Sequence, residues 1–292
     1  MQADNPATAD GDLVALDPDV GQTGDAADVD EHGGHGQPQL HDGQQRVPAG
    51  QQLRVLAVLG QRGHGVDQAQ AVLIVARTED AKTGNLKPAL FIVPTDSENF
   101  SYTMIDMELQ NPEKQFQLFL DDVRLPADAL VGSEDAALSQ LFAGLNPERI
   151  MAAASAVGMG RFALDKAVSY VKERTVWKTP IGAHQAIAHP LAQGKVELEM
   201  AKLMMQKAAT LYDAGDDWGA AEPANMAKYA AAEACVKVVD QAVHSLGGNG
   251  LTTEYGLAPM LSLARIARIA PVSREMILNF VAQTSLGLPK SY

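Results

Sequence analysis

The spacing of apolar residues divides the chain into a segment of strands followed by a segment of helices. In Gln-Phe-Gln-Leu-Phe-Leu, residues 115–120, the even positions are apolar and two odd positions are polar, which predicts a strand with one buried face. Short apolar runs bounded by turn residues predict strands over residues 71–76, 89–93, 102–107 and 116–123. Together these strands are typical of part of an antiparallel β domain.

Apolar residues at helical spacing dominate the second half of the chain and predict four long helices. The predicted helices cover residues 150–174, 191–212, 224–246 and 259–285, with Pro271 interrupting the last one. Gly247 and Gly248 are expected to stop the third helix. Long amphipathic helices joined by short loops predict an antiparallel four-helix bundle.

The sequence Asn146-Pro147-Glu148-Arg149 is predicted to begin the first long helix, after a short separate helix over residues 136–145. Asn is a favourable N-cap because its side-chain oxygen accepts unpaired backbone N–H groups, and Pro suits the first helical position because it has no N–H group. Glu148 would then lie in the first turn, where a carboxylate stabilises the positive helix end by about 0.3–1 kcal/mol. Periodicity alone favours this modest structural role for Glu148.

Residues 1–64 differ in composition from the rest, since they are rich in Asp, Gly, Gln and His and lack Phe, Tyr, Trp, Ile and Lys. Such a segment buries little apolar surface and is predicted to be disordered, with at most one short strand over residues 53–59. His32, His35 and His41 raise the alternative of a metal site, but no predicted element fixes them, and we favour solvated disorder with no metal. The predicted organisation is therefore a disordered leader, a partial β domain and a helical domain, over residues 1–64, 65–132 and 133–292.

Composition and charge restrict the class of protein further. The 292 residues are 46% hydrophobic and 20% charged, which is ordinary for a soluble chain with a sizeable core. The net charge of -13 argues against a nucleic acid or an anionic membrane surface as the partner. The single Cys235 excludes an internal disulfide and suits a reducing compartment. With no long apolar run and no secretory signal pattern, we expect a cytoplasmic protein without a membrane span.

Several motifs occur in the order and spacing of one known family. They are Asp121-Asp122-Val123-Arg124-Leu125-Pro126 with Gly132, Glu148-Arg149, Arg174 with Pro180-Ile181 and Gln185, Met226-Ala227-Lys228, and Leu246-Gly247-Gly248-Asn249-Gly250 with Arg265 and Arg268. From about Val66 to its C-terminus, the chain therefore resembles the acyl-CoA dehydrogenase family. The resemblance implies an α+β, mainly α fold: a middle β domain before an antiparallel four-helix bundle, in a homodimer or tetramer that holds FAD across subunits.

The resemblance also implies a catalytic base. In this family a carboxylate removes the α proton of an acyl-CoA thioester while the β hydrogen leaves as hydride to the flavin. Many members carry that Glu in a late loop, but residues 270–275 read Ala-Pro-Val-Ser-Arg-Glu and lack the motif. Members similar to the isovaleryl and long-chain enzymes use the Glu-Arg pair of the long helix, which Glu148 matches. Glu275 is the other candidate for the base, but a structural role is expected for it. Asn146, Pro147 and Arg149 are expected to contact the substrate.

The resemblance to the family also implies which residues contact the flavin. Arg174 and Gln185 match the family's residues facing the FAD pyrophosphate, to which a guanidinium and an amide supply donors in fixed geometry. Without the resemblance, Arg174 could equally be a surface cation at a helix end. Trp177 replaces the usual Phe, and His244 replaces the usual Gln of a segment that approaches the partner subunit's cofactor. That segment is formed by His244, Ser245, Leu246, Gly247 and Gly248.

The implied function is dehydrogenation of an acyl-CoA to the 2-enoyl-CoA in fatty acid metabolism, with electrons passed to an electron-transfer flavoprotein. Residues 1–64 show no counterpart of the family's N-terminal helical domain, which covers the acyl pocket, or of the first β strands. A gene fragment, or a leader translated from another reading frame, would explain this. The alternative function is then a catalytically silent helical module that serves only for oligomerisation.

Overall fold

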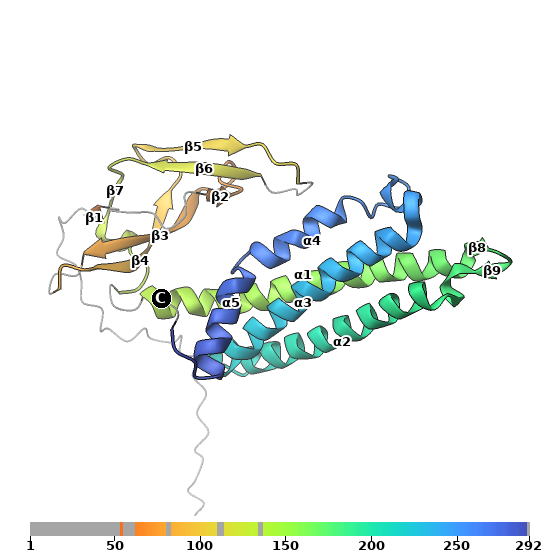
Figure 1. Cartoon of the computed structure of the whole chain (residues 1–292). Helices are drawn as coiled ribbons and strands as arrows, with labels where there is room; N and C mark the ends of the chain where they lie inside the picture. Colours follow the sequence, from red (N-terminus) through yellow and green to blue (C-terminus); the bar gives the residue numbers. More distant parts are fainter. Residues whose placement is uncertain (1–52, 55–61, 80–82, 110–113, 134–136, 291–292) are drawn as a thin grey trace, which may run out of the picture. The chain divides into compact units, whose positions relative to one another are not determined.

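The computed structural model describes residues 53–54, 62–79, 83–109, 114–133 and 137–290. Strands occupy the first part of the described chain and long helices the second, as Figure 1 shows. The α+β, mainly α fold class expected from the sequence is therefore confirmed. The predicted disorder of the leader and the histidines at positions 32, 35 and 41 fall outside the described residues.

The β part consists of antiparallel pairs. Strand β3 (Ala71–Glu79) pairs with β4 (Leu86–Pro94), with Ile74 opposite Phe91. A three-stranded sheet has the order β2-β6-β5, and a two-stranded sheet pairs β1 with β7. Their bounds are β1 Leu53–Arg54, β2 Arg62–His64, β5 Phe100–Ile105, β6 Gln115–Leu120 and β7 Arg124–Leu125. Within β6 the side chains of Phe116 and Leu118 are buried, which confirms the alternation predicted for this strand.

Two of these strands precede the predicted domain boundary at residue 65. Strand β2 pairs with β6, and β1 pairs with β7, so residues 53–54 and 62–64 belong to the sheets by backbone pairing. Only β1 falls within the short strand expected over residues 53–59. The boundary itself stays a prediction, but the β part begins earlier than composition indicated.

Three long helices dominate the second part of the chain, and α3 packs against both of the others (Figure 1). They are α1 (Ala137–Glu173), α2 (Gln185–Asp213) and α3 (Asp217–Leu246). The fourth predicted helix is divided by the loop around Pro271 into α4 (Met260–Ile269) and α5 (Arg274–Phe280), which a π-helical turn, η4 (Val281–Ser285), continues. Short elements complete the chain: η1 (Ala127–Ala129) follows β7, and the helical part also contains the β8–β9 hairpin (Thr175–Val176 and Thr179–Pro180), η2 (Ile181–Ala183) and η3 (Gly247–Leu251).

The predicted helix start at Asn146 and Pro147 is wrong. Helix α1 runs without interruption from Ala137, so Pro147 lies inside it and the two helices expected on either side of residue 146 are one. The physical reason is a tertiary contact: the Asn146 amide, rather than capping its own helix, donates to the backbone oxygen of Asp217 at 2.8 Å. The Asn146 Oδ1 atom, which capping would require as an acceptor, accepts from the Arg149 Nη1 atom instead.

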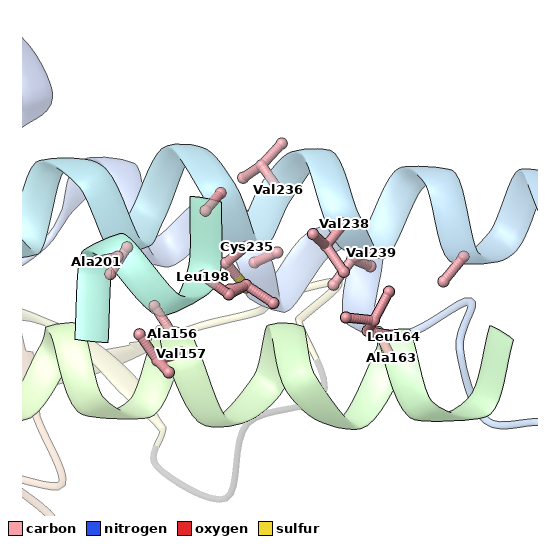
Figure 2. Packing of buried hydrophobic residues seen from close by; sticks show 14 of the residues in the cluster. Ala156, Val157, Ala163, Leu164, Leu198, Ala201, Cys235, Val236, Val238 and Val239 are labelled. Atoms are coloured by element: carbon pink, nitrogen blue, oxygen red, sulfur yellow. The ribbon is translucent and has the colours of Figure 1, made fainter. Parts of the chain in front are cut away.

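The helical core is built from small side chains that let the three long helices approach closely. Gly160 of α1 faces Leu198 of α2 and the backbone of Cys235 of α3, and a Cβ atom at position 160 would lie 2.7 Å from the Leu198 Cδ2 atom. Leu198, Ala201 and Cys235 have no exposed surface (Figure 2). Packing of this kind tolerates little change in volume.

Asp216 caps α3, and its loss should cost measurable stability. Its Oδ1 atom accepts a hydrogen bond from the Gly219 backbone N–H at 2.8 Å. Asp216→Ala is expected to lower the free energy of unfolding by about 0.5–2 kcal/mol, because an N–H group of the first turn loses its partner. Asp240→Ala, at an exposed position within α3, is the matched control. Urea unfolding of both variants tests the cap, and equal midpoints would contradict it.

Candidate active site

Glu148 lies on α1 about three turns after Ala137, with its side chain exposed. A carboxylate at that position is too far from the helix start to complement the positive end, because that effect is confined to the first turn. The modest capping role that periodicity favoured for Glu148 is therefore excluded. An exposed carboxylate in mid-helix is accessible to a molecule that binds over this face of α1.

The neighbours of Glu148 point into the bundle. Asn146 and Arg149 are each 4% exposed, and the Arg149 Nη1 atom donates to the Asn146 Oδ1 atom at 3.2 Å. Burial lowers the pKa of the Arg149 guanidinium, and the adjacent Glu148 carboxylate opposes that shift. Pro147 is half-buried. Direct substrate contact by Asn146, Pro147 and Arg149 stays a prediction. The observed contacts fix Asn146 and Arg149 inside the bundle, on the turn of α1 that carries Glu148.

Lys228 of α3 belongs to the same polar cluster. It is 1% exposed, and its Nζ atom donates a short hydrogen bond to the backbone oxygen of Val272, in the loop between α4 and α5. Burial first, and then the positive charge of Arg149, lower the pKa of Lys228 to about 8, while Glu275 opposes them. Sequence reasoning gave Lys228 no role. A signal was present, because this Lys shares the helical spacing of the buried residues Ala224 and Ala231.

Ion pairs hold both sides of the same late loop to α3. The Arg268 Nη2 atom lies 2.6 Å from the Glu233 Oε2 atom, and the Arg274 Nη1 atom lies 3.5 Å from the Glu233 Oε1 atom. Arg268 belongs to α4 and Arg274 begins α5, so one carboxylate of α3 bridges the residues on either side of the loop. The rival carboxylate, Glu275, is 72% exposed and pairs with Arg274 at 3.4 Å.

The predicted flavin contacts lie at the other end of α1. Arg174 follows directly after α1, and its backbone oxygen accepts from the Ile181 N–H at 2.8 Å, which closes the β8–β9 hairpin. Trp177 lies at the hairpin tip, is 85% exposed and meets the His184 ring edge-on at 6.1 Å between centroids. Gln185 begins α2 just after His184, and its side chain is exposed. The structure therefore brings Arg174, Trp177 and Gln185 into one short segment.

The segment from His244 to Gly248 ends α3 on the same side of the bundle. The Asn249 Nδ2 atom donates to the Tyr170 Oη atom at 3.0 Å, which ties the start of η3 to the last turn of α1. Gly247 is the C-cap of α3 with φ of +59°, as the predicted helix stop requires. His244, Gly247 and Gly248 are exposed, whereas Ser245 and Leu246 are buried. Exposed glycine backbone can approach a ligand closely.

These two groups of predicted residues are far apart within one chain. Glu148 and Arg174 are separated by most of α1, which at 1.5 Å per residue corresponds to roughly 38 Å. That length exceeds the diameter of a small domain. One flavin cannot touch both positions of the same subunit.

A cavity of about 570 Å³ opens between α1 and α2 beside the hairpin. Its wall is mainly apolar, with Leu164, Val168 and Leu191 among the lining residues and Lys172 and Lys195 also lining it. Glu148 is not among its lining residues, so this hollow is distinct from the site around the predicted base.

The described residues contain no cluster of three or more His, Cys, Asp or Glu side chains that could hold a metal ion. Within the same residues, the helices are too short or too polar for any of them to cross a membrane.

Comparison with known proteins defines the class. The family model for the acyl-CoA dehydrogenase C-terminal domain matches residues 138–286, which is half of the chain and includes both groups of predicted site residues. The chain belongs to the acyl-CoA dehydrogenase family.

Individual relatives agree with this assignment. Acyl-CoA dehydrogenase FadE12 of Mycobacterium tuberculosis is 76% identical over 228 residues, which cover 78% of this chain and 59% of FadE12. The structure of butyryl-CoA dehydrogenase from Megasphaera elsdenii matches with a TM-score of 0.69 and 28% identity, over 76% of this chain and 58% of that one. A structure described as an electron transferring flavoprotein of Acidaminococcus fermentans matches with a TM-score of 0.69 and 25% identity, over 81% of this chain and 63% of that one. The chain thus spans about three fifths of the curated relatives it matches.

Proposed function

We propose that this protein oxidises an acyl-CoA thioester to the 2-enoyl-CoA, with Glu148 as the base that takes the α proton. The observation that carries the proposal is the exposed Glu148 on a helical turn anchored by the buried Asn146 and Arg149, in a chain 76% identical over 228 residues to an acyl-CoA dehydrogenase. A general base must be accessible and held in a fixed position. Glu148 meets both conditions, because its helical turn is anchored to α3 through Asn146.

The cofactor proposed is FAD, which supplies a hydride acceptor when bound. The residues at the hairpin end suit its pyrophosphate, since Arg174 and Gln185 offer exposed donors and a Cβ at Gly247 or Gly248 would meet no atom within 4 Å. Trp177 offers an exposed ring beside these donors. His244 is exposed in the same region, while the buried Ser245 and Leu246 would support the turn that precedes the glycines.

The separation of these two groups supports a homo-oligomer as the working form. Because Glu148 and Arg174 are roughly 38 Å apart on one helix, the base of one subunit and the hairpin of another would serve the same flavin. A dimer or a dimer of dimers satisfies this geometry. The oligomer is therefore part of the proposed site, because each site needs residues of two copies.

Electron-transfer flavoprotein is the proposed electron acceptor, and fatty acid metabolism in the cytoplasm is the proposed setting. The family resemblance of the sequence motifs implies a partner of this class. Reduced flavin must be reoxidised after each turnover, so the reaction needs such an electron acceptor.

Purified protein tests the proposed function directly. We expect a yellow oligomer with near-stoichiometric flavin that is bleached by an acyl-CoA in the absence of oxygen. A colourless oligomer that binds no added FAD would contradict the proposal and would favour the oligomerisation module instead.

Arg174→Ala is expected to weaken FAD binding by about tenfold to a hundredfold, because a hydrogen bond to a charged group contributes about 1.5–3 kcal/mol. Fluorescence titration of the apoprotein with FAD measures this change. Arg161→Ala removes another exposed arginine of the same helical region and is the matched control. An equal effect of both substitutions would show that general charge, rather than the hairpin end, attracts the cofactor.

A further inference from the structure

Tyr170, in the last turn of α1, contacts two segments that are distant from each other in the sequence. Its backbone oxygen accepts from the Arg174 N–H group at 2.9 Å, and its Oη atom accepts from the Asn249 Nδ2 atom at 3.0 Å. Its ring meets the Tyr255 ring edge-on, with 5.7 Å between the centroids, which is a favourable arrangement of two aromatic rings. Tyr170 therefore joins the start of the hairpin and the segment after α3 to one point of α1.

The turn at residues 247–248 is open on its outer side, but the residues that follow it are held. A Cβ atom at either glycine would meet no atom within 4 Å. Gly250, by contrast, is buried, and a Cβ atom there would lie 2.5 Å from the Val243 backbone oxygen, so this part of η3 packs directly on the end of α3. The Asn249 backbone oxygen accepts from both the N–H group and the Oγ1 atom of Thr252, at 3.1 Å and 2.8 Å.

The side chain of Asn249 supplies a tether that the two glycines cannot supply themselves. Glycine permits many backbone conformations and has no side chain through which a turn could be fixed. Asn249 is the next residue, and its amide reaches α1 across 79 positions of sequence. A hydrogen bond is directional, so it restricts the rotation of the turn, which ring packing alone would leave free. The Tyr170–Asn249 hydrogen bond is exposed, and its main effect is therefore on the placement of the turn.

We propose that Tyr170 and Asn249 are positioning residues for the FAD diphosphate, because their hydrogen bond holds the backbone of Gly247 and Gly248 in a fixed place relative to Arg174. The inference rests on the proposed function. Arg174 is anchored to the backbone oxygen of the same tyrosine, so both parts of the proposed cofactor site are set before the cofactor arrives. A site that is already ordered loses less conformational freedom on binding. The Tyr170 hydroxyl acts through Asn249 and needs no contact with the cofactor.

Hydrogen–deuterium exchange of the full chain without FAD tests the tether. Tyr170→Phe keeps the ring that packs on Tyr255 and removes only the hydroxyl. It is expected to speed exchange of the backbone amides of residues 247–252 by about threefold to tenfold, the range that corresponds to one hydrogen bond. Tyr212→Phe is the matched control, since it makes the same change at a half-buried tyrosine in the last turn of α2. Unchanged exchange in Tyr170→Phe would overturn the tether.

Titration of the apoprotein with FAD tests the effect on the cofactor site. Tyr170→Phe and Asn249→Ala are each expected to raise the Kd for FAD by about threefold to tenfold, because each removes the same hydrogen bond. The double variant should bind FAD no more weakly than either single variant, since the bond can be lost only once. Additive effects would overturn the shared role. A lower urea midpoint with an unchanged Kd would identify the hydrogen bond as merely structural.

The two hypotheses can fail separately. If the wild type does not bind FAD, the proposed cofactor is wrong, and the role of Tyr170 in binding fails with it, while the exchange experiment still decides whether the tether exists. If the wild type and both single variants bind FAD equally well, the proposed function stands and this inference is wrong. If Tyr170→Phe does not fold, Asn249→Ala removes the same hydrogen bond from an exposed position, and its exchange and Kd are decisive.

Discussion

Replacing Glu148 with Gln is expected to slow flavin bleaching by an acyl-CoA by about 10²- to 10⁴-fold, the usual contribution of a positioned general base. The amide keeps the size of the side chain but cannot accept the α proton. FAD should remain bound, because Glu148 is not one of the residues proposed to hold its pyrophosphate, and the amide keeps the shape of the side chain. Anaerobic stopped-flow measurement of flavin absorbance gives the rate, and the retained absorbance gives the cofactor content.

Two control variants sharpen this test. Glu275→Gln removes the rival carboxylate, which is 72% exposed and paired with Arg274, and is expected to keep most of the bleaching rate. Glu173→Gln changes another exposed carboxylate at the far end of α1 and should have no effect. Wild-type bleaching in Glu148→Gln, together with its loss in Glu275→Gln, would reassign the base to the late loop.

Leu198→Ala is expected to lower the free energy of unfolding by about 2–5 kcal/mol. Leu198 is fully buried on α2 and packs against Gly160 of α1. Figure 2 shows Leu198 next to Cys235 of α3. Truncation would leave a cavity that three packed helices cannot close without moving. Urea unfolding measures the loss, and Val196→Ala, at a 56% exposed position of the same helix, is the control.

Gly160→Ala is expected to couple with that substitution. Alone, the added Cβ would lie 2.7 Å from the Leu198 Cδ2 atom, which outweighs the gain of about 1 kcal/mol in helix propensity. In the Leu198→Ala background the obstructing atom is absent, so Gly160→Ala should recover part of the lost stability. A double-mutant cycle measures the coupling, and additive effects would show that the two positions do not share this space.

Much of the secondary structure was determined by the sequence through local patterns. The alternation in β6 and the Gly247 stop of α3 require only neighbouring residues, and the structure confirms both. Strand β2 was missed because three residues carry too little periodicity to predict an element. Its pairing with β6 comes from a distant part of the chain and is invisible to local reasoning.

The start of α1 could not be predicted, because local chemistry and tertiary structure favoured different outcomes. Asn146 followed by Pro147 is a good helix start for an isolated segment. In the folded chain the Asn146 amide reaches the Asp217 oxygen, and the helix continues through Pro147 from Ala137. This contact spans 71 positions in sequence, so only the folded chain reveals it.

The sequence by itself determined that this chain has a β part followed by long helices, and its motifs identified Glu148 as the predicted base. Only the tertiary structure decided that Glu148 stands exposed in mid-helix, which removes its capping role. Tertiary structure also revealed the burial of Lys228 beside Arg149, because the charge cluster depends on which helix faces meet. The local sequence pattern predicts which residues can be buried, whereas the packing of the helices determines which charged side chains lie close together.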